Sequence, residues 1–178
     1  SVILIRGRKR VWEQFARRHG LACERADTTT GVYGTVSGRS FCLSTPDDSS
    51  DVGPLGIQSV RMQIGLRGDF PSETRISRAQ GWVATVDRLA QAEAVATGDE
   101  KFDSLVLVES ADPEKVRAYL TPQRRAMIRE LVVDSGASDA GIDGADLFIQ
   151  DREMLTDLRR IEQRLELMLK LAPGLDAV

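Results

Sequence analysis

The chain is predicted to fold as an α+β domain, in which an antiparallel β-sheet carries helices packed on one face. Three patterns predict this class. Apolar and polar residues alternate over 57–66, as in a strand with one buried face. The dipeptide Ser37-Gly38 joins two segments of strand character, and a glycine in a two-residue connection is typical of an antiparallel hairpin. An apolar stripe at helical spacing then runs over about 152–171, which predicts a long C-terminal helix.

Composition narrows the class of protein further. The 178 residues are 42% hydrophobic and 29% charged, which suits one compact domain or two tightly joined halves. There are 24 cations against 27 acids, so no overall basic field exists and no nucleic-acid partner is expected. Cys23 and Cys42 lack Cys-x-x-Cys spacing and are predicted to stay free thiols, as in a cytosolic protein.

The first ten residues form an unusual segment. Val2-Ile-Leu-Ile5 precedes four cations among five positions, which are Arg6, Arg8, Lys9 and Arg10. Four apolar residues cannot span a bilayer, which needs about 20. One interpretation is the cytoplasmic end of a membrane helix that continues upstream, because cations collect on that side. The other is a first strand or a helix start with solvated charges. We therefore separate 1–10, as a membrane-proximal stub or first strand, from a globular domain over 11–178.

The first half of this domain is expected to begin with a helix. Trp12, Phe15, Ala16 and His19 share one helix face, and Gly20 ends the helix. A polar stretch rich in turn formers over 45–56 predicts a long loop. Residues 81–96 suit a weak amphipathic helix, which we favour, or a linker. Strands are expected over 21–26, 32–37, 39–45 and 57–66, with a short edge strand over 74–77.

The second half contains a nearly continuous apolar run. It lies within 102–109 and predicts the central strand of this half. Asp112-Pro113 and Thr121-Pro122 each place an N-cap residue before a proline, which predicts helices over 113–120 and 122–132. A hairpin over 140–149 is expected to turn at Asp143-Gly144, and Pro173-Gly174 to end the last helix. The pattern also allows two related halves, 11–80 and 97–178.

The stripe on the last helix has two interpretations. Leu158, Ile161, Leu165 and Met168 follow spacings of three, four and three, which fit a two-heptad seam. A coiled coil normally needs three or four heptads, so packing on the domain's own sheet is favoured. Self-association through this helix is the alternative.

Several motifs together resemble a known group of proteins. They are Trp12-Glu-Gln-Phe15, His19-Gly20-Leu21, Gly34-Thr-Val-Ser-Gly38-Arg39, Thr97-Gly98-Asp99-Glu-Lys-Phe102-Asp103 and Tyr119-Leu120-Thr121-Pro122. In this order the chain resembles uncharacterised bacterial proteins known only as a domain of unknown function. The resemblance covers most of the chain, and the Gly-Asp-x-x-Phe-Asp segment and the Leu-Thr-Pro helix start carry it best. It implies a membrane-anchored protein with this domain in the cytoplasm, and it supplies no catalytic residues that could be carried over to this chain.

Acidic clusters and the lone histidine offer candidate sites. Asp134, Asp139, Asp143 and Asp146 lack the alternating oxygen ligands of an EF-hand loop, so turn formation is favoured over calcium binding. Asp99, Glu100 and Asp103 are interpreted as a polar loop in which Asp99 caps the next segment, with a Mg²⁺ or acid–base site as the alternative. His19 has no partner at ligand spacing, so a structural role at a helix end is favoured over a titrating or metal-binding one.

The remaining candidates are cationic. Arg124, Arg125 and Arg129 are interpreted as the wet face of a helix, or as a surface for an acidic partner or lipid head groups. The leading hypothesis is a non-enzymatic interaction or scaffolding module without cofactor, at the cytoplasmic face of a bacterial inner membrane. Its partner would be a protein or a second copy. The alternatives are a small-ligand or metal-dependent enzyme using the acidic loops at 99–103 and 134–146, and a soluble cytoplasmic homo-oligomer whose first strand is 2–5.

Overall fold

The computed structural model describes residues 2–25, 30–45, 59–71, 73–79, 93–152 and 156–177. Within these ranges nine strands form one sheet in the order β1-β2-β3-β4-β9-β8-β5-β7-β6, and every neighbouring pair is antiparallel. The predicted α+β class is confirmed. The strands are β1 (Ala22–Arg25), β2 (Thr30–Val36), β3 (Arg39–Ser44), β4 (Val60–Gly65), β5 (Arg75–Arg78), β6 (Glu93–Ala94), β7 (Val106–Ser110), β8 (Asp139–Asp143) and β9 (Asp146–Asp151).

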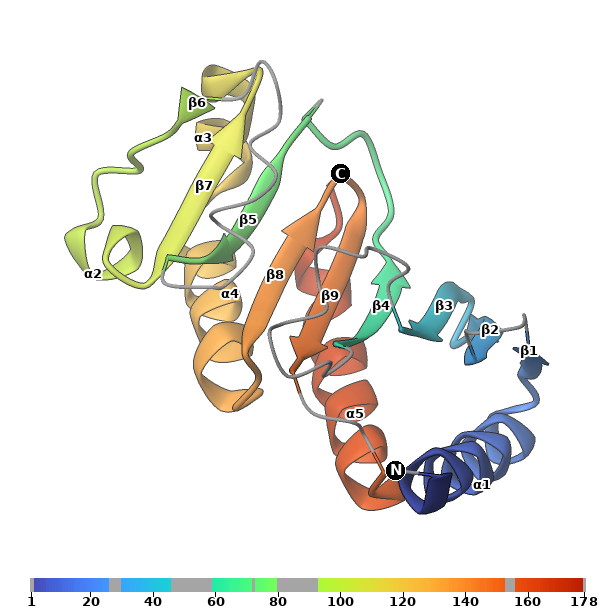
Figure 1. Ribbon diagram of the computed structural model, residues 1–178. Helices are drawn as coiled ribbons and strands as arrows, with labels where there is room; N and C mark the ends of the chain where they lie inside the picture. The colour runs from blue at the N-terminus through green and yellow to red at the C-terminus, as the bar shows by residue number, and fades with distance from the viewer. Residues whose placement is uncertain are drawn as a thin grey trace.

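The helices pack on one face of this sheet, as expected. They are α1 (Val2–His19), α2 (Glu100–Asp103), α3 (Pro113–Tyr119), α4 (Pro122–Asp134) and α5 (Leu158–Leu175). Figure 1 shows α4 and α5 side by side behind the sheet, with α1 beside the lower end of α5. One hydrophobic core joins buried side chains from all five helices to the facing side chains of the strands.

The centre of the sheet follows the predicted alternation. Met62 and Ile64 of β4 pair with Ile149 and Leu147 of β9, and all four are buried against the helices. Arg61 and Gln63, which alternate with them, are half-buried on the opposite face. Residues 57 and 58 of the predicted strand lie outside the described residues.

The two predicted hairpins form, with one change of register. Ser37 and Gly38 have φ values of 51° and 71°, the positive pair that a type I′ turn requires. In the second hairpin Asp143 pairs with Asp146, so the turn residues are Gly144-Ala145 and not Asp143-Gly144. Gly144 has a φ of 60° at the first central position, where a type II′ turn favours glycine. Cys23 and Cys42 are free thiols, as predicted.

The helix starts at Asp112-Pro113 and Thr121-Pro122 are confirmed. The Asp112 side chain accepts from the backbone N–H of Lys115, and the Thr121 hydroxyl accepts from that of Arg124. The short α2 begins in the same way, at Asp99. For this reason Phe102 belongs to α2, and the predicted strand 102–109 starts only at Val106.

Four other expectations are wrong in detail. Residues 2–5 are helical, so the first-strand interpretation of the N-terminus fails. β5 is not an edge strand, because it lies between β8 and β7. β7 is not central either, since only β6 lies beyond it in the described sheet. The predicted segment 81–96 lies mostly outside the described residues, and its described end contains β6 in place of a helix.

The last helix begins later and ends later than predicted. It starts at Leu158, after the N-cap Asp157, and continues through Pro173 to Leu175. Side chains at the end of α3 and in the first turn of α4 donate hydrogen bonds to carbonyls at the C-terminal end of α5, where partners within the helix are lacking. The Tyr119 hydroxyl donates to the Leu175 carbonyl at 2.5 Å, and Arg124 donates to the carbonyls of Gly174 and Asp176.

Asp176 then ties the end of α5 to the sheet. Its two carboxylate oxygens accept from the Arg39 guanidinium at 2.8 and 2.7 Å, and the Arg67 backbone N–H donates to one of them at 2.8 Å. The hydrogen bonds from Arg39 hold the pKa of Asp176 below its usual range, against the opposing effect of partial burial. Folding therefore favours the ionised carboxylate at this position.

Replacing Asp176 with Asn is expected to lower the free energy of unfolding at pH 7 by ~2 kcal/mol, the usual scale for a hydrogen bond to a charged group. Because the folded pKa is depressed, the stabilisation is present above the unfolded carboxyl value of about 3.9 and is lost as pH falls through the lower, folded value. The difference between wild type and variant should thus shrink below about pH 4. Urea titrations at neutral and acid pH measure this difference in stability. A difference that does not change with pH would contradict a role for the ionised Asp176 carboxylate.

Candidate functional site

The cationic segment 6–10 lies in the first half of α1. The helix is unbroken from Val2 to His19, which corresponds to about 27 Å at 1.5 Å per residue. Its second half is anchored, because Trp12, Phe15 and Ala16 are buried in the core, whereas Arg10 is exposed. Figure 1 shows the N-terminal end of α1 at the lower edge of the molecule. The cations therefore belong to the same helix as the core contacts.

His19 lies where α1 meets α5. Its Nε2 is 2.8 Å from Oε2 of Glu162, and its ring centroid is 4.7 Å from that of Phe15. Arg18 reaches the other oxygen of Glu162 at 3.2 Å. These contacts account for His19 as a residue that joins two helices.

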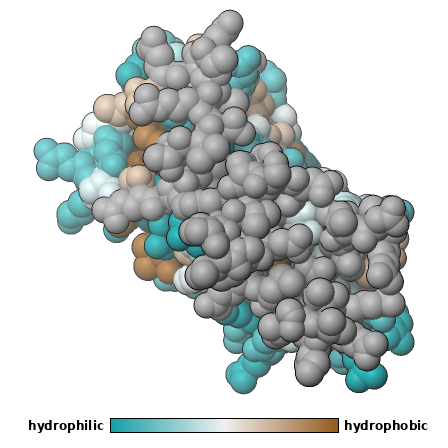
Figure 2. Space-filling model, in the orientation of Figure 1, coloured by the Kyte–Doolittle hydropathy of each residue, from teal (hydrophilic) through white to brown (hydrophobic). Residues whose placement is uncertain are grey.

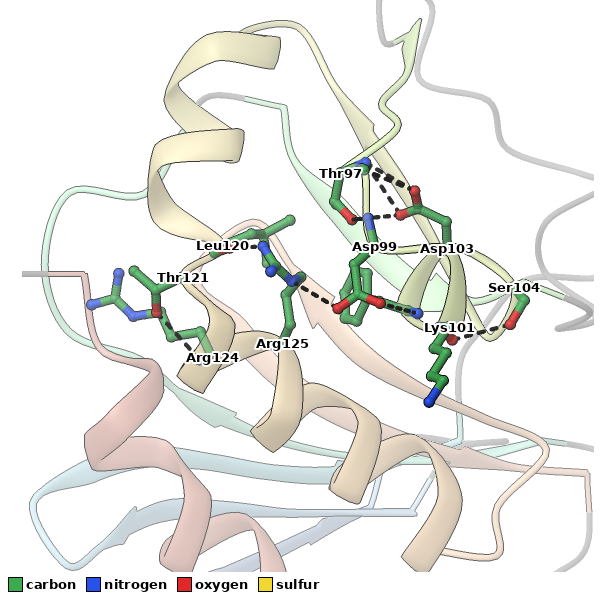
Figure 3. Close-up of polar contacts among 11 residues, drawn as sticks. Thr97, Asp99, Lys101, Asp103, Ser104, Leu120, Thr121, Arg124 and Arg125 are labelled. Atoms are coloured by element: carbon green, nitrogen blue, oxygen red, sulfur yellow. Dashed lines mark hydrogen bonds and ion pairs between the residues drawn. The ribbon is translucent and has the colours of Figure 1, made fainter.

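The acidic loop before β7 is engaged in local structure (Figure 3). Asp99 accepts from the Phe102 backbone N–H at 3.1 Å and from Nε of Arg125 at 3.3 Å, and the Phe102 bond is the main cause of its lowered pKa. Asp103 accepts from the backbone N–H and the hydroxyl of Thr97 and from the N–H of Gly98. The capping role predicted for Asp99 is confirmed. In the described part of the chain, no group of three or more His, Cys, Asp or Glu side chains is arranged to hold a metal ion.

The second acidic cluster is spread over the sheet. Asp139, Asp143 and Asp146 lie on the sheet face away from the helices, whereas Asp134 ends α4. Asp139 is buried and accepts from the N–H groups of Arg78 and Ala140 at 3.0 and 2.8 Å, and burial raises its pKa. Asp143 pairs with Arg61 at 2.9 Å. Asp139 and Asp143 therefore take part in the hydrogen bonding and ion pairing of the sheet.

The interpretation of Arg124 and Arg125 as a wet helix face is wrong. Both are half-buried. Arg124 donates to three carbonyls near the end of α5 and of α3, and its guanidinium lies 4.5 Å from the centroid of the Tyr119 ring. Arg125 donates to the Leu120 carbonyl at 2.8 Å as well as pairing with Asp99. They join α4 to its neighbours and do not form a surface for an acidic partner.

The stripe on α5 faces the chain's own core. Ile161, Leu165 and Met168 are buried and Leu158 is half-buried, in contact with the core that α1 and α4 share. Arg164 lies on the same buried side and is 3% exposed. It pairs with Asp151 of β9, which is also buried. The sequence reasoning missed this ion pair, although an arginine among core positions of an amphipathic helix signals a buried partner.

A groove that sequence reasoning did not identify opens at one end of β5. It has a volume of about 580 Å³ and is bordered by the ends of β5, α4 and β9 and by the starts of β7 and β8. Two exposed large hydrophobic residues line it, Leu105 and Val133, which are 38% and 56% exposed. A signal existed in the sequence: Leu131-Val-Val133 places three apolar residues in a row on a helix, and they cannot all face the core.

No protein-family model matches the chain, and no curated protein does. Among solved structures, one similar fold is that of the mycobacterial trehalose monomycolate transport factor A, TtfA. Its TM-score is 0.62 at 13% sequence identity, and the match covers 96% of this chain and 94% of that chain. At this identity the likeness establishes a shared fold alone. Among the described helices, none is long and apolar enough to cross a membrane. The resemblance to a bacterial domain of unknown function stays a prediction.

Proposed function

We propose that this chain is a non-enzymatic interaction module of a bacterial membrane-anchored protein and works at the cytoplasmic face of the inner membrane. In this role the start of α1 contacts anionic lipid head groups, while the body of the domain binds a protein partner or a second copy. The observation that carries the proposal is the continuity of α1. One helix bears four cations among five positions at one end and is fixed in the core at the other.

Helix geometry supports this arrangement. Each residue turns an α-helix by about 100°, so Arg10 lies on the side of α1 opposite to Trp12 and Phe15. Trp12 and Phe15 are buried, and Arg10 is indeed exposed. A basic segment next to an anionic membrane gains about 1 kcal/mol per Lys or Arg near the surface. The fold shared with a transport factor is compatible with a role without catalysis, and the carboxylates at 99 and 103 are engaged within the fold.

Vesicle binding tests the proposal. The chain should sediment with vesicles of phosphatidylethanolamine and phosphatidylglycerol more than with vesicles of phosphatidylcholine, and added salt should weaken the binding because it screens exposed charges. The quadruple variant R6Q/R8Q/K9Q/R10Q should bind the anionic vesicles at least about thirtyfold more weakly, which corresponds to the ~2 kcal/mol expected from two cations alone.

A matched variant controls for net charge. K101Q/K115Q/R117Q/R159Q removes four cations that are exposed on α2, α3 and α5, and it should leave binding nearly unchanged. Equal losses in the two variants would show that overall charge and not the start of α1 governs binding. Equal binding to anionic and neutral vesicles would also contradict the proposal.

A further inference from the structure

We propose that the groove at the end of β5 binds a single-chain anionic amphiphile, meaning an alkyl chain that ends in a carboxylate or a phosphate. Ligand sites are usually hollows of about 300–1,000 Å³ that combine apolar walls with a few polar groups. The groove, at about 580 Å³, lies within this range.

The apolar part of the groove consists of hydrophobic side chains that are exposed to water. Among the described residues three large hydrophobic side chains are exposed, and two of them, Leu105 and Val133, line this hollow. Leu105 lies between α2 and β7, and Val133 lies in the last turn of α4, next to the buried Val132. In the coloured part of Figure 2, hydrophobic atoms appear among hydrophilic ones over α4. Apolar side chains gathered at one hollow of such a surface indicate a binding site for an apolar group.

The polar part of the groove is cationic. Arg78 and Arg152 line it with Ser104 and Ser138, and no carboxylate is among the described residues that line it. The Nη2 atom of the Arg78 guanidinium donates to the Val132 carbonyl at 2.5 Å, which fixes the side chain at the C-terminal end of α4. The Nε of Arg78 is buried and makes no hydrogen bond to any of the described residues. A buried donor without a partner costs free energy, so an anion that accepts from it would be stabilised.

These two halves select one class of ligand. A guanidinium matches the paired oxygens of a carboxylate or phosphate, and the aliphatic walls match an alkyl chain. A free anion would leave Leu105 and Val133 exposed, and a neutral alkane would leave Nε of Arg78 without a partner. In Figure 1 the bordering elements β7 and α4 lie on the left, away from α1 at the lower right, so the groove and the basic segment 6–10 can be tested separately.

Calorimetric titration of the intact chain with four probes tests the proposal. Octanoate and octyl phosphate, below their micelle concentrations, should each saturate one site, and comparison of the two distinguishes a carboxylate from a phosphate head group. Octanol and inorganic phosphate should bind at least about tenfold more weakly. Octanol lacks the charged head group and its charge-assisted hydrogen bonds, and inorganic phosphate lacks the alkyl chain and its apolar contacts. Octanol binding as tight as that of octanoate would overturn the proposal, as would the absence of saturable binding by both anionic probes.

Variants locate the site. R78M keeps much of the aliphatic stem and should weaken octanoate about tenfold while leaving octanol unchanged, since only the anion contact is lost. V133D places a carboxylate at an exposed position and should weaken both anionic alkyl probes at least tenfold without affecting folding. R159M and Y33D are the matched exposed controls on α5 and β2 and should change nothing. Losses of equal size in the control variants would assign the binding to nonspecific contacts and overturn the site.

Discussion

Replacing Asp151 with Ala is expected to lower the free energy of unfolding by about 3–5 kcal/mol, the cost of leaving a buried charge without its partner. Asp151 and Arg164 are 4% and 3% exposed, and a guanidinium nitrogen of Arg164 donates to the carboxylate at 3.0 Å. Burial lowers the pKa of Arg164 to about 10, so the guanidinium stays charged at pH 7 and D151A leaves that charge without its carboxylate. In D151A, Arg164 keeps its hydrogen bond to the Ser135 carbonyl, which at 3.4 Å is longer than the bond that is lost. Urea titration followed by circular dichroism measures the loss.

Two further variants test whether the loss of stability in D151A comes from a buried charge that has no partner. D151L/R164M fills the same space with apolar groups and should recover at least half of the loss, because well-packed apolar residues often match a buried pair in stability. D69A removes the partner of Lys115 in a surface ion pair, in which the Asp69 side chain is 92% exposed. It should lower the free energy of unfolding by less than about 0.5 kcal/mol. If D151A lowers the stability no more than D69A, the Asp151–Arg164 pair contributes no more than a surface pair, and the large effect predicted for it is wrong.

Local chemistry explains which parts of the fold could be predicted from the sequence. The proline-linked caps at Asp112 and Thr121 and the turn at Ser37-Gly38 depend on neighbouring residues, and each formed where predicted. The alternation in β4 survives because one of its faces is buried. The position of β5 between β8 and β7 depends instead on pairing between strands far apart in the chain, which no local pattern encodes.

The same distinction holds for the candidate sites. The cap at Asp99 was predictable because its partner, Phe102, is three residues away. The arginines of α4 were misassigned because their acceptors lie near the end of α5, about 50 residues later, and become neighbours only on folding. The groove joins ends of five elements for the same reason. The run Leu131-Val-Val133 signalled one of its exposed hydrophobic residues, but the arginines beside it could not be placed without the strand order.

Replacing Trp12 with Ala is expected to lower the free energy of unfolding by about 3–5 kcal/mol, the usual cost of truncating a large buried aromatic side chain. Trp12 is fully buried, and Phe15, one turn later, packs 5.6 Å from Phe41 of β3 between ring centroids. The loss should fall first on α1, because Trp12 and Phe15 are the aromatic anchors of this helix. Limited trypsin digestion should then cleave the variant faster after Arg17 and Arg18, which are exposed but lie in helical backbone.

R17A is the matched control on the same helix. Its side chain is exposed and, among the described residues, donates to the Glu13 carbonyl alone, so the variant should stay within about 0.5 kcal/mol of wild type and resist trypsin after Arg18 as wild type does. Stability of W12A equal to that of R17A would show that α1 is not part of the cooperative core. The proposed membrane contact would then lose its basis, because it depends on α1 joining the cations of 6–10 rigidly to the sheet. A large loss in W12A alone would support that rigid connection.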